Sequence, residues 1–247
     1  MARATSSSLL LLSLVFALWD FSPVAGQSTT LTVAGPNSTA TPRLAGANAL
    51  DITFDPPVVQ VTGVLTVDVL ACGLVPGLPT NAAIGSTSLM TAPPTVTASA
   101  TARGTNIGSL TISGASLNVS TPTFPINQTD GTYTVAPNSG TVVHVARANG
   151  SLTGKPFDES GINIVFQSGG TLPAVQITGT FRPLPPGLLE MTATSTVQVP
   201  LNQVVTAVGL GGSELVRNDT AGGSIQLVFS LVATGPDPCL DPECQKC

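Results

Sequence analysis

The 247-residue chain has 8 basic and 13 acidic residues, a formal net charge of −5, and only 9% charged residues in all. With no basic patch in the sequence, nucleic acid is not expected as a partner. A hydrophobic content of 42% with positive mean hydropathy argues against general disorder. The length suits one domain of about 200 residues or two of about 100.

The N-terminal segment has the features of a secretory signal peptide. Arg3 precedes an apolar stretch at residues 9–19, and the small residues at 24–26 predict cleavage before Gln27. The apolar stretch is too short to span a bilayer as a stable helix, and no later segment is long enough. We therefore predict that residues 1–26 are a signal peptide, that the mature protein is secreted, and that it has no membrane span. The alternative is a buried N-terminal helix.

Beyond this segment, hydrophobic residues recur with a period of two, the spacing of β-strands. In residues 63–72, for example, Leu65 and Val67 share one face while Thr66 and Asp68 share the other. Strands are predicted, in chain order, at residues 31–34, 50–54, 63–72, 95–102, 109–119, 132–135, 141–147, 162–167, 174–181, 189–199, 203–208 and 224–233. About a dozen short strands without an amphipathic helix predict an all-β, antiparallel β-sandwich, with a β-solenoid as the alternative.

A short repeat bears on the number of domains. Val59-Gln-Val-Thr-Gly63 recurs as Val175-Gln-Ile-Thr-Gly179, 116 residues later. If the repeat reflects duplication, the β-sandwich body at residues 27–235 consists of two units that meet near residue 140. If it is a coincidence in a chain rich in Val, Thr and Gly, the body is one large sandwich. Residues 236–247 are predicted to form a cysteine-rich tail.

The four cysteines are predicted to form disulfides, because a secreted chain meets an oxidising environment. We expect one tail cysteine to pair with Cys72 and the other two to close a small loop in the tail. Intermolecular pairing and a zinc site are the alternatives. Zinc is disfavoured because the only histidine is distant in sequence. The cysteines concerned are Cys72, Cys239, Cys244 and Cys247.

Five sites match the N-glycosylation acceptor Asn-x-Ser/Thr, and a secreted protein would expose them to the transferase. Each is expected to face solvent. All but Asn118 lie in turn-like sequence, whereas Asn118 lies at the end of a predicted strand. The acceptors are Asn37, Asn118, Asn127, Asn149 and Asn218.

Three predicted strands place hydroxyl side chains on one face. These sets are Thr95, Thr97, Ser99 and Thr101; Ser109, Thr111 and Ser113; and Thr192, Thr194 and Thr196. The simplest interpretation is a solvated sheet face on a charge-poor protein, and the alternatives are surfaces that bind sugars or ice. Trp19, the one tryptophan, lies in the predicted signal peptide. A lectin that stacks sugars on aromatic side chains is therefore not expected.

Catalytic motifs are weak. His144, the sole histidine, lies in an apolar strand, where a satisfied buried side chain is favoured over a catalytic base. Residues 114–118 fail the Gly-x-Ser-x-Gly pattern at the last position, and Pro156 occupies the hydroxyl position of a phosphate loop that also lacks the required spacing.

Paired carboxylates are the remaining candidates. Asp51 and Asp55 would share a strand face about 13 Å apart, whereas glycosidase pairs lie about 5 to 9.5 Å apart. Asp158 and Glu159 could bind calcium in a loop, but no calcium-loop motif supports such a site. We predict no catalytic residue, no metal site and no cofactor.

These observations predict a secreted, N-glycosylated structural or adhesive protein of an extracellular matrix, cell wall or coat, without catalytic activity. The expected partners are matrix or cell-surface components. Self-association through edge strands or the tail cysteines is a further expectation. A secreted carbohydrate- or ice-binding module is the first alternative. An enzyme similar to glycoside hydrolases, with carboxylates that converge in the fold, is the second.

Overall fold

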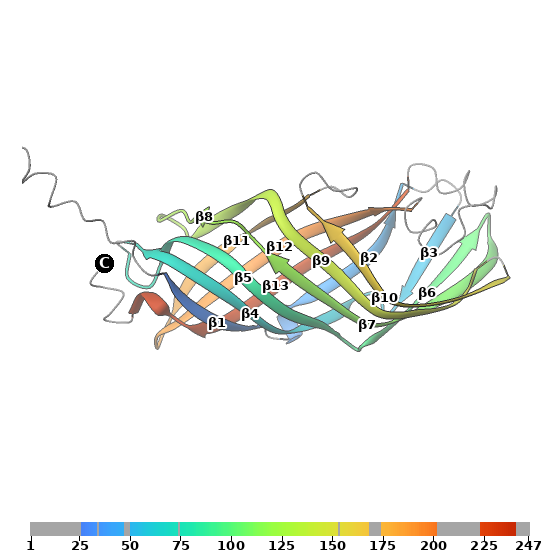
Figure 1. Cartoon of the computed structure of the whole chain (residues 1–247), viewed down its shortest axis with the longest axis horizontal. Helices are drawn as coiled ribbons and strands as arrows, with labels where there is room; N and C mark the ends of the chain where they lie inside the picture. Colours follow the sequence, from blue (N-terminus) through green and yellow to red (C-terminus); the bar gives the residue numbers. More distant parts are fainter. Residues whose placement is uncertain are drawn as a thin grey trace, which may run out of the picture.

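The computed structural model describes residues 26–33, 35–46, 50–73, 75–152, 154–167, 174–201 and 223–240. These residues form thirteen β-strands and two short 3-10 helices (Figure 1). The strands are β1 (Gln27–Val33), β2 (Thr39–Ala45), β3 (Leu50–Asp55), β4 (Val59–Cys72), β5 (Pro79–Ala92), β6 (Thr95–Ala102), β7 (Thr105–Ser120), β8 (Phe124–Pro125), β9 (Thr132–Leu152), β10 (Lys155–Phe166), β11 (Val175–Leu184), β12 (Leu188–Pro200) and β13 (Ser224–Pro236). The helices are η1 (Gly35–Asn37) and η2 (Pro238–Leu240).

The strands form one antiparallel sheet that closes on itself. Its order is β10-β9-β11-β12-β13-β1-β4-β5-β7-β6-β3, and an additional pairing between β9 and β7 completes a ring. β2 pairs with β13 and β4, and β8 pairs with β5. The predicted all-β, antiparallel class is confirmed. All thirteen described strands belong to this one sheet, and its ring surrounds the large core cluster. Both halves of the sequence contribute to this sheet, and residue 140 lies inside β9.

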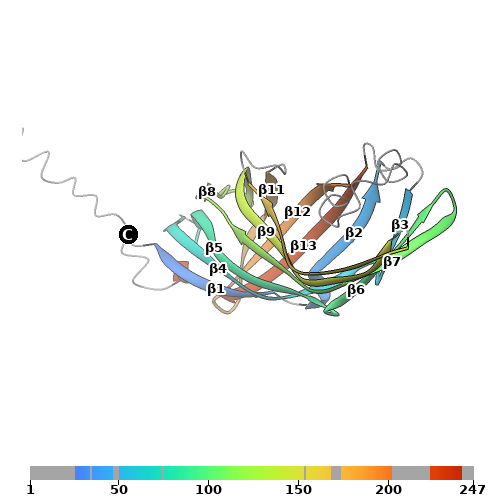
Figure 2. The same cartoon turned by 45° about the vertical axis from the view of Figure 1, so that its right-hand side comes forward.

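β9 connects the ring to a second part of the sheet. Its N-terminal residues pair with β11, whereas its C-terminal residues pair with β7 on one side and β10 on the other. With β6 and β3 added to β7, a five-stranded extension β3-β6-β7-β9-β10 continues beyond the ring (Figure 2). Two strand edges, those of β3 and β10, therefore end the strand order.

Burial follows the period of two that the sequence predicts. In β1 and β4, alternate residues such as Leu31, Val67 and Val69 are fully buried, and their neighbours point outward. One large core cluster draws side chains from nearly every strand of the ring. A smaller cluster around Val145, Ala148 and Phe157 lies on the extension.

Three aromatic side chains pack together in the large core, toward one end of the closed ring of strands. Phe124, Tyr133 and Phe181 come from β8, β9 and β11, with centroid separations of 4.8, 5.2 and 6.5 Å. The Tyr133 hydroxyl donates a 2.8 Å hydrogen bond to the backbone oxygen of Thr192. Burial raises the pKa of Tyr133, so the phenol stays protonated.

The short repeat has a common structural role. In both copies the two aliphatic residues are buried and the glutamine is exposed. The closing glycine allows a neighbouring backbone to approach closely. A Cβ on Gly63 would lie 2.0 Å from the Ser88 oxygen, and one on Gly179 would lie 1.9 Å from the Thr192 oxygen. The repeat therefore marks two strands in which the neighbouring strand's backbone comes unusually close to the final glycine.

Gly179→Ala is expected to lower the free energy of unfolding by about 2–3 kcal/mol, because the added methyl group must displace backbone rather than a flexible side chain. Gly35→Ala is the matched control, since its Cβ would meet side-chain atoms at 3.5 Å. That control should stay within about 0.5 kcal/mol of the wild type. Denaturant unfolding measures both, and equal effects would contradict the close approach at Gly179.

Several local predictions were wrong. The strands β2 and β5 were not predicted, and the two strands predicted at residues 132–135 and 141–147 are parts of one longer strand, β9. Asn149 was expected at a turn, but it lies within β9, in register with Thr111 on β7 and Asp158 on β10. Its neighbour Gly150 is used for close strand packing, because a Cβ there would lie 2.1 Å from the Ser109 oxygen. The predicted strand at residues 203–208 lies outside the described residues.

Candidate functional site

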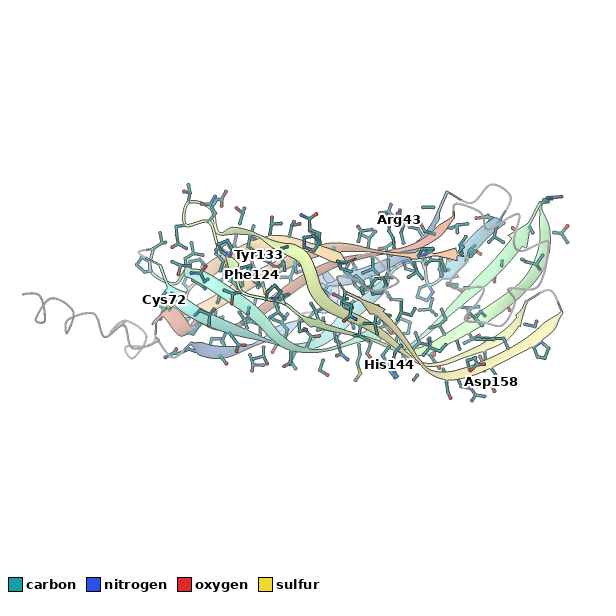
Figure 3. All side chains as sticks on the ribbon, turned by 45° about the horizontal axis from the view of Figure 1, so that its top comes forward. Arg43, Cys72, Phe124, Tyr133, His144 and Asp158 are labelled. Atoms are coloured by element: carbon teal, nitrogen blue, oxygen red, sulfur yellow. A yellow bond between two sulfur atoms is a disulfide. The ribbon has the colours of Figure 1, made fainter. Side chains whose placement is uncertain are left out.

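His144 was predicted to be a buried side chain. It lies on the outer face of β9 and is only half-buried. Its Nδ1 is 2.8 Å from the Asn163 Oδ1 on β10, and Ser116 on β7 is its register partner on the other side. His144 lies on the extension, distant from Cys72 (Figure 3). The hydrogen bond to Asn163 provides a partner for one nitrogen of the His144 ring.

The candidate carboxylates lie on β3 and β10, the two outermost strands of the extension. Asp51 and Asp55 are exposed on β3 and pair with Thr101 and Thr97, so they share one face as predicted. Asp158 accepts two hydrogen bonds from Arg147, of 2.8 and 2.7 Å. This contact holds the pKa of Asp158 below, and that of Arg147 above, the usual range. The described residues contain no group of three metal-ligating side chains.

Four of the predicted glycosylation acceptors lie in the described part of the chain. Asn37, Asn118 and Asn127 are exposed, on η1, β7 and a turn, whereas Asn149 is half-buried. The Asn127 Oδ1 accepts a 2.9 Å hydrogen bond from the Thr129 backbone, which closes a local turn. Asn218 lies outside the described residues, as does most of the predicted signal peptide.

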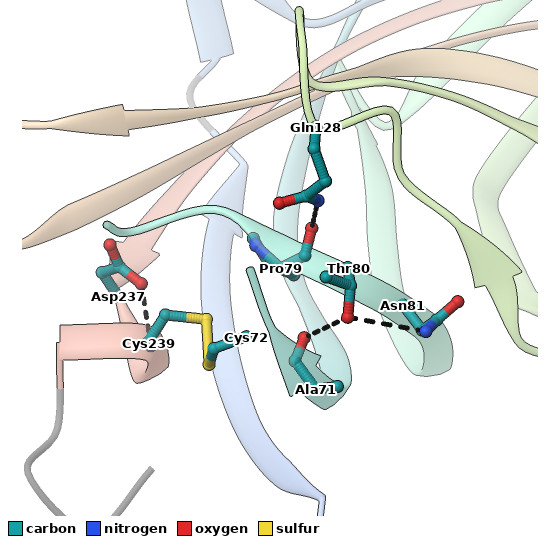
Figure 4. The surroundings of a disulfide bond; sticks show 8 residues. All are labelled: Ala71, Cys72, Pro79, Thr80, Asn81, Gln128, Asp237 and Cys239. Atoms are coloured by element: carbon teal, nitrogen blue, oxygen red, sulfur yellow. Dashed lines mark hydrogen bonds between the residues drawn. A yellow bond between two sulfur atoms is a disulfide. The ribbon is translucent and has the colours of Figure 1, made fainter. Parts of the chain in front are cut away.

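The predicted link between tail and body is confirmed. A disulfide joins Cys72 at the end of β4 to Cys239 in η2 (Figure 4). Asp237 beside it is buried, with 6% of its surface exposed, and its Oδ1 accepts a 2.9 Å hydrogen bond from the Cys239 backbone. Burial raises the pKa of Asp237, and this hydrogen bond opposes the shift. Cys244 and Cys247 lie outside the described residues.

The first two predicted hydroxyl sets lie side by side. Thr97 on β6 pairs with Thr111 on β7, and Ser99 pairs with Ser109. The row through Thr97 and Thr111 continues to Asn149 and Asp158. Because carboxylates and a predicted glycan acceptor interrupt this surface, it is a mixed polar face.

Thr192 and Thr194 of the third predicted set belong to a surface of the ring, and Thr196 lies beside it, opposite Val228. Thr194 on β12 is in register with Thr178 on β11, which is in register with Thr134 on β9. In the other direction the row continues through Ser230 to Thr39. A second row runs through Thr132, Thr180 and Thr192. We call these hydroxyl residues the threonine face: Thr39, Thr132, Thr134, Thr178, Thr180, Thr192, Thr194 and Ser230.

Hydrogen bonds between neighbouring strands fix several of these hydroxyls. The Oγ1 atoms of Thr178 and Thr194 are 3.1 Å apart, and those of Thr180 and Thr192 are 2.8 Å apart. The exposed members include Thr178 and Thr194. The nearest charged pair on β11 and β12 lies at the margin, where Arg182 approaches Glu190 at 3.5 Å. At one end of the second row, the Asp130 carboxylate accepts a 2.7 Å hydrogen bond from the Thr132 hydroxyl. Charged groups therefore lie at the margins of the face, whereas its longest row is uncharged and partly pre-ordered.

A pocket of about 440 Å³ adjoins the threonine face. Its polar lining comes from six residues: Gln176, Thr178, Thr194, Ser195, Thr196 and Gln198. Glutamine side chains both donate and accept hydrogen bonds, as do hydroxyls. The described lining contains no aromatic or charged residue. Such a pocket suits an uncharged ligand rich in hydroxyl groups.

The shape of the face limits what it can contact. Sheets twist by about 20–25° from strand to strand, so the four steps of the longest row accumulate about 80–100°. The threonine face is consequently curved, and a rigid flat surface can touch only part of it. A flexible chain can follow it.

No known protein family matches the sequence, and no curated protein is significantly similar to it. Among the helices of the described residues, none has the length and apolar character needed to cross a membrane. The candidate site thus rests on the chain's own geometry. Sequence reasoning identified Thr192, Thr194 and Thr196 but not the threonines of β9 and β11. The alternating Thr132-x-Thr134 and Thr178-x-Thr180 were the signal that could have found them.

Proposed function

We propose that the protein is a secreted, glycosylated, non-catalytic adhesive protein of an extracellular matrix, cell wall or coat, and that its threonine face holds a neutral polysaccharide. The observation that carries the proposal is the in-register row of hydroxyls across five strands, beside a pocket with two glutamine side chains. Secretion is inferred from the N-terminal segment and the acceptor sites.

The chemistry of the face supports a neutral polymer. Hydroxyls and amides can replace the water around sugar hydroxyls, and a ligand that lies along the uncharged longest row avoids the desolvation cost of an ion. Each hydrogen bond contributes only about 0.5–1.5 kcal/mol net. Binding strength must therefore come from many contacts along an extended ligand, which is the behaviour expected of an adhesive protein.

Ice is the second candidate ligand. Side chains repeat about every 4.8 Å across the strands and about every 6.7 Å along them, which is a lattice-like array. The twist of the sheet disfavours this ligand, because a crystal plane cannot follow it. Thermal hysteresis in dilute solution of the purified protein would favour ice over a polysaccharide.

Co-sedimentation with insoluble polysaccharides tests the proposal. We expect the glycoprotein to pellet with at least one neutral polymer among cellulose, chitin and a β-1,3-glucan. The double variant Thr178→Val, Thr194→Val should bind about tenfold more weakly, because two hydroxyls on adjacent strands are lost. Its matched control is Thr97→Val, Thr111→Val, which removes an equivalent cross-strand pair from the mixed polar face. Equal binding by both variants, or binding to no polymer, would contradict the proposal.

A further inference from the structure

The outer edge of β10 is an unusual feature of the extension. β10 (Lys155–Phe166) pairs with β9 along one side and, among the described strands, with none along the other. An unpaired edge presents backbone N–H and C=O groups that can pair with another strand. Folded proteins commonly protect such edges with charges, prolines or local bends.

The protection of this edge is confined to one half of the strand. Pro156, Asp158 and Glu159 lie in the first half, and Gly161, with φ +65°, bends the strand at its middle. The second half, residues 162–166, reads Ile-Asn-Ile-Val-Phe. It contains no charge, proline or glycine and has the high β-propensity typical of strands that pair with other strands.

The side chains of this half are arranged for pairing. Phe166 is fully buried and Ile162 and Ile164 are partly buried, so one face joins the interior. Asn163 and Val165 point outward, and Val165 leaves 42% of its surface exposed. A strand added at this edge would cover part of Val165 and continue the sheet.

We infer that residues 162–166 of β10 pair with the same segment of a second copy of this chain, in an antiparallel two-fold dimer. If Ile164 lies opposite its own copy, Ile162 faces Phe166 and Asn163 faces Val165. Inward residues then meet inward residues, and outward residues meet outward ones, as sheet continuity requires. Asp158 and Glu159 fall outside the paired segment, so no acidic side chains are brought together.

The other terminal edge is a poorer partner. β3 (Leu50–Asp55) carries the exposed carboxylates of Asp51 and Asp55 along its short edge. Antiparallel pairing of β3 with β10 that matches outward faces places a carboxylate of Asp51 or Asp55 beside Val165 or Asn163, neither of which is charged. Self-pairing of β10 avoids this contact. A two-fold contact also closes on itself, so it produces a dimer and not a filament.

The paired segment is short, which sets the expected affinity. Stable interfaces bury about 1,200–2,000 Å², and five residues from each chain bury less than that. A reversible dimer with a dissociation constant of about 10–100 µM is expected for such a contact. The inference does not depend on the proposed ligand, although a dimer would present two threonine faces to one polymer.

Sedimentation velocity over a concentration series tests the inference on the secreted glycoprotein. The wild type should shift from monomer to dimer, and Val165→Lys should raise the dissociation constant at least tenfold, because a lysine on the edge opposes pairing. Val64→Lys is the matched control. Val64 is 41% exposed on β4, which pairs on both sides, so this variant should dimerise as the wild type does.

A second variant guards against a general effect of the added charge. Val165→Thr keeps a β-branched side chain and should retain the dimer, while circular dichroism confirms that every variant is folded. A wild type that remains monomeric up to about 1 mM would overturn the inference, because a dimer with a dissociation constant of about 10–100 µM would be mostly formed at that concentration. So would a Val165→Lys variant that dimerises as strongly as the wild type.

Discussion

Replacing both Cys72 and Cys239 with alanine is expected to lower the free energy of unfolding by about 3–5 kcal/mol. The bond joins residues 167 positions apart. In the chain-entropy account, a crosslink that closes so long a loop removes more freedom from the unfolded chain than a short one does. In the folded state it ties β4 to the segment that follows β13, the last strand of the sheet.

Denaturant unfolding with and without a reductant measures this effect. Wild-type protein should lose most of the same stability when reduced, and the double variant should not respond to the reductant. Both cysteines are replaced because a single Cys239→Ala change would leave Cys72 with two other tail cysteines as alternative partners. A double variant as stable as the oxidised wild type would show that the contacts around η2 hold the tail without the bond.

The sequence predicts this fold best where one strand face is buried and the other is solvated. β4, β12 and β13 show the clear alternation of apolar and polar residues, and they were predicted close to their true extent. β2 contains Pro42, and β5 contains Gly85 within a run of small polar residues, so neither shows this alternation. Their place in the sheet is set by pairing with β13 and β4, which are distant interactions.

The candidate site illustrates the same limit. A period of two assigns each threonine to a strand face, so Thr192 and Thr194 could be grouped from sequence alone. The register that brings Thr178 opposite Thr194 depends on the β11–β12 pairing, so it cannot be predicted from the sequence of either strand alone. The same holds for Thr134, which joins the row through the pairing of β9 with β11.

Phe181→Ala is expected to lower the free energy of unfolding by about 3–5 kcal/mol, the usual cost of truncating a large side chain in a well-packed core. Phe181 is 2% exposed and contacts both Phe124 and Tyr133. Its backbone N–H also donates a 2.9 Å hydrogen bond to the Gly131 oxygen, where a Cβ on Gly131 would lie 2.1 Å from the Phe181 oxygen. Because the backbones of Gly131 and Phe181 are already in close contact, the neighbouring residues cannot easily move into the cavity that the lost Phe181 ring would leave.

Phe157→Ala is the matched control, because it makes the same chemical change in the small cluster of the extension. Phe157 has few buried neighbours, so we expect only the transfer cost of about 2 kcal/mol. Denaturant unfolding of both variants at one pH gives the comparison. A larger loss for Phe181 would place the main stability of the molecule in the closed ring, where β8, β9 and β11 meet. Equal losses would mean that the extension is packed as tightly around Phe157 as the ring is around Phe181.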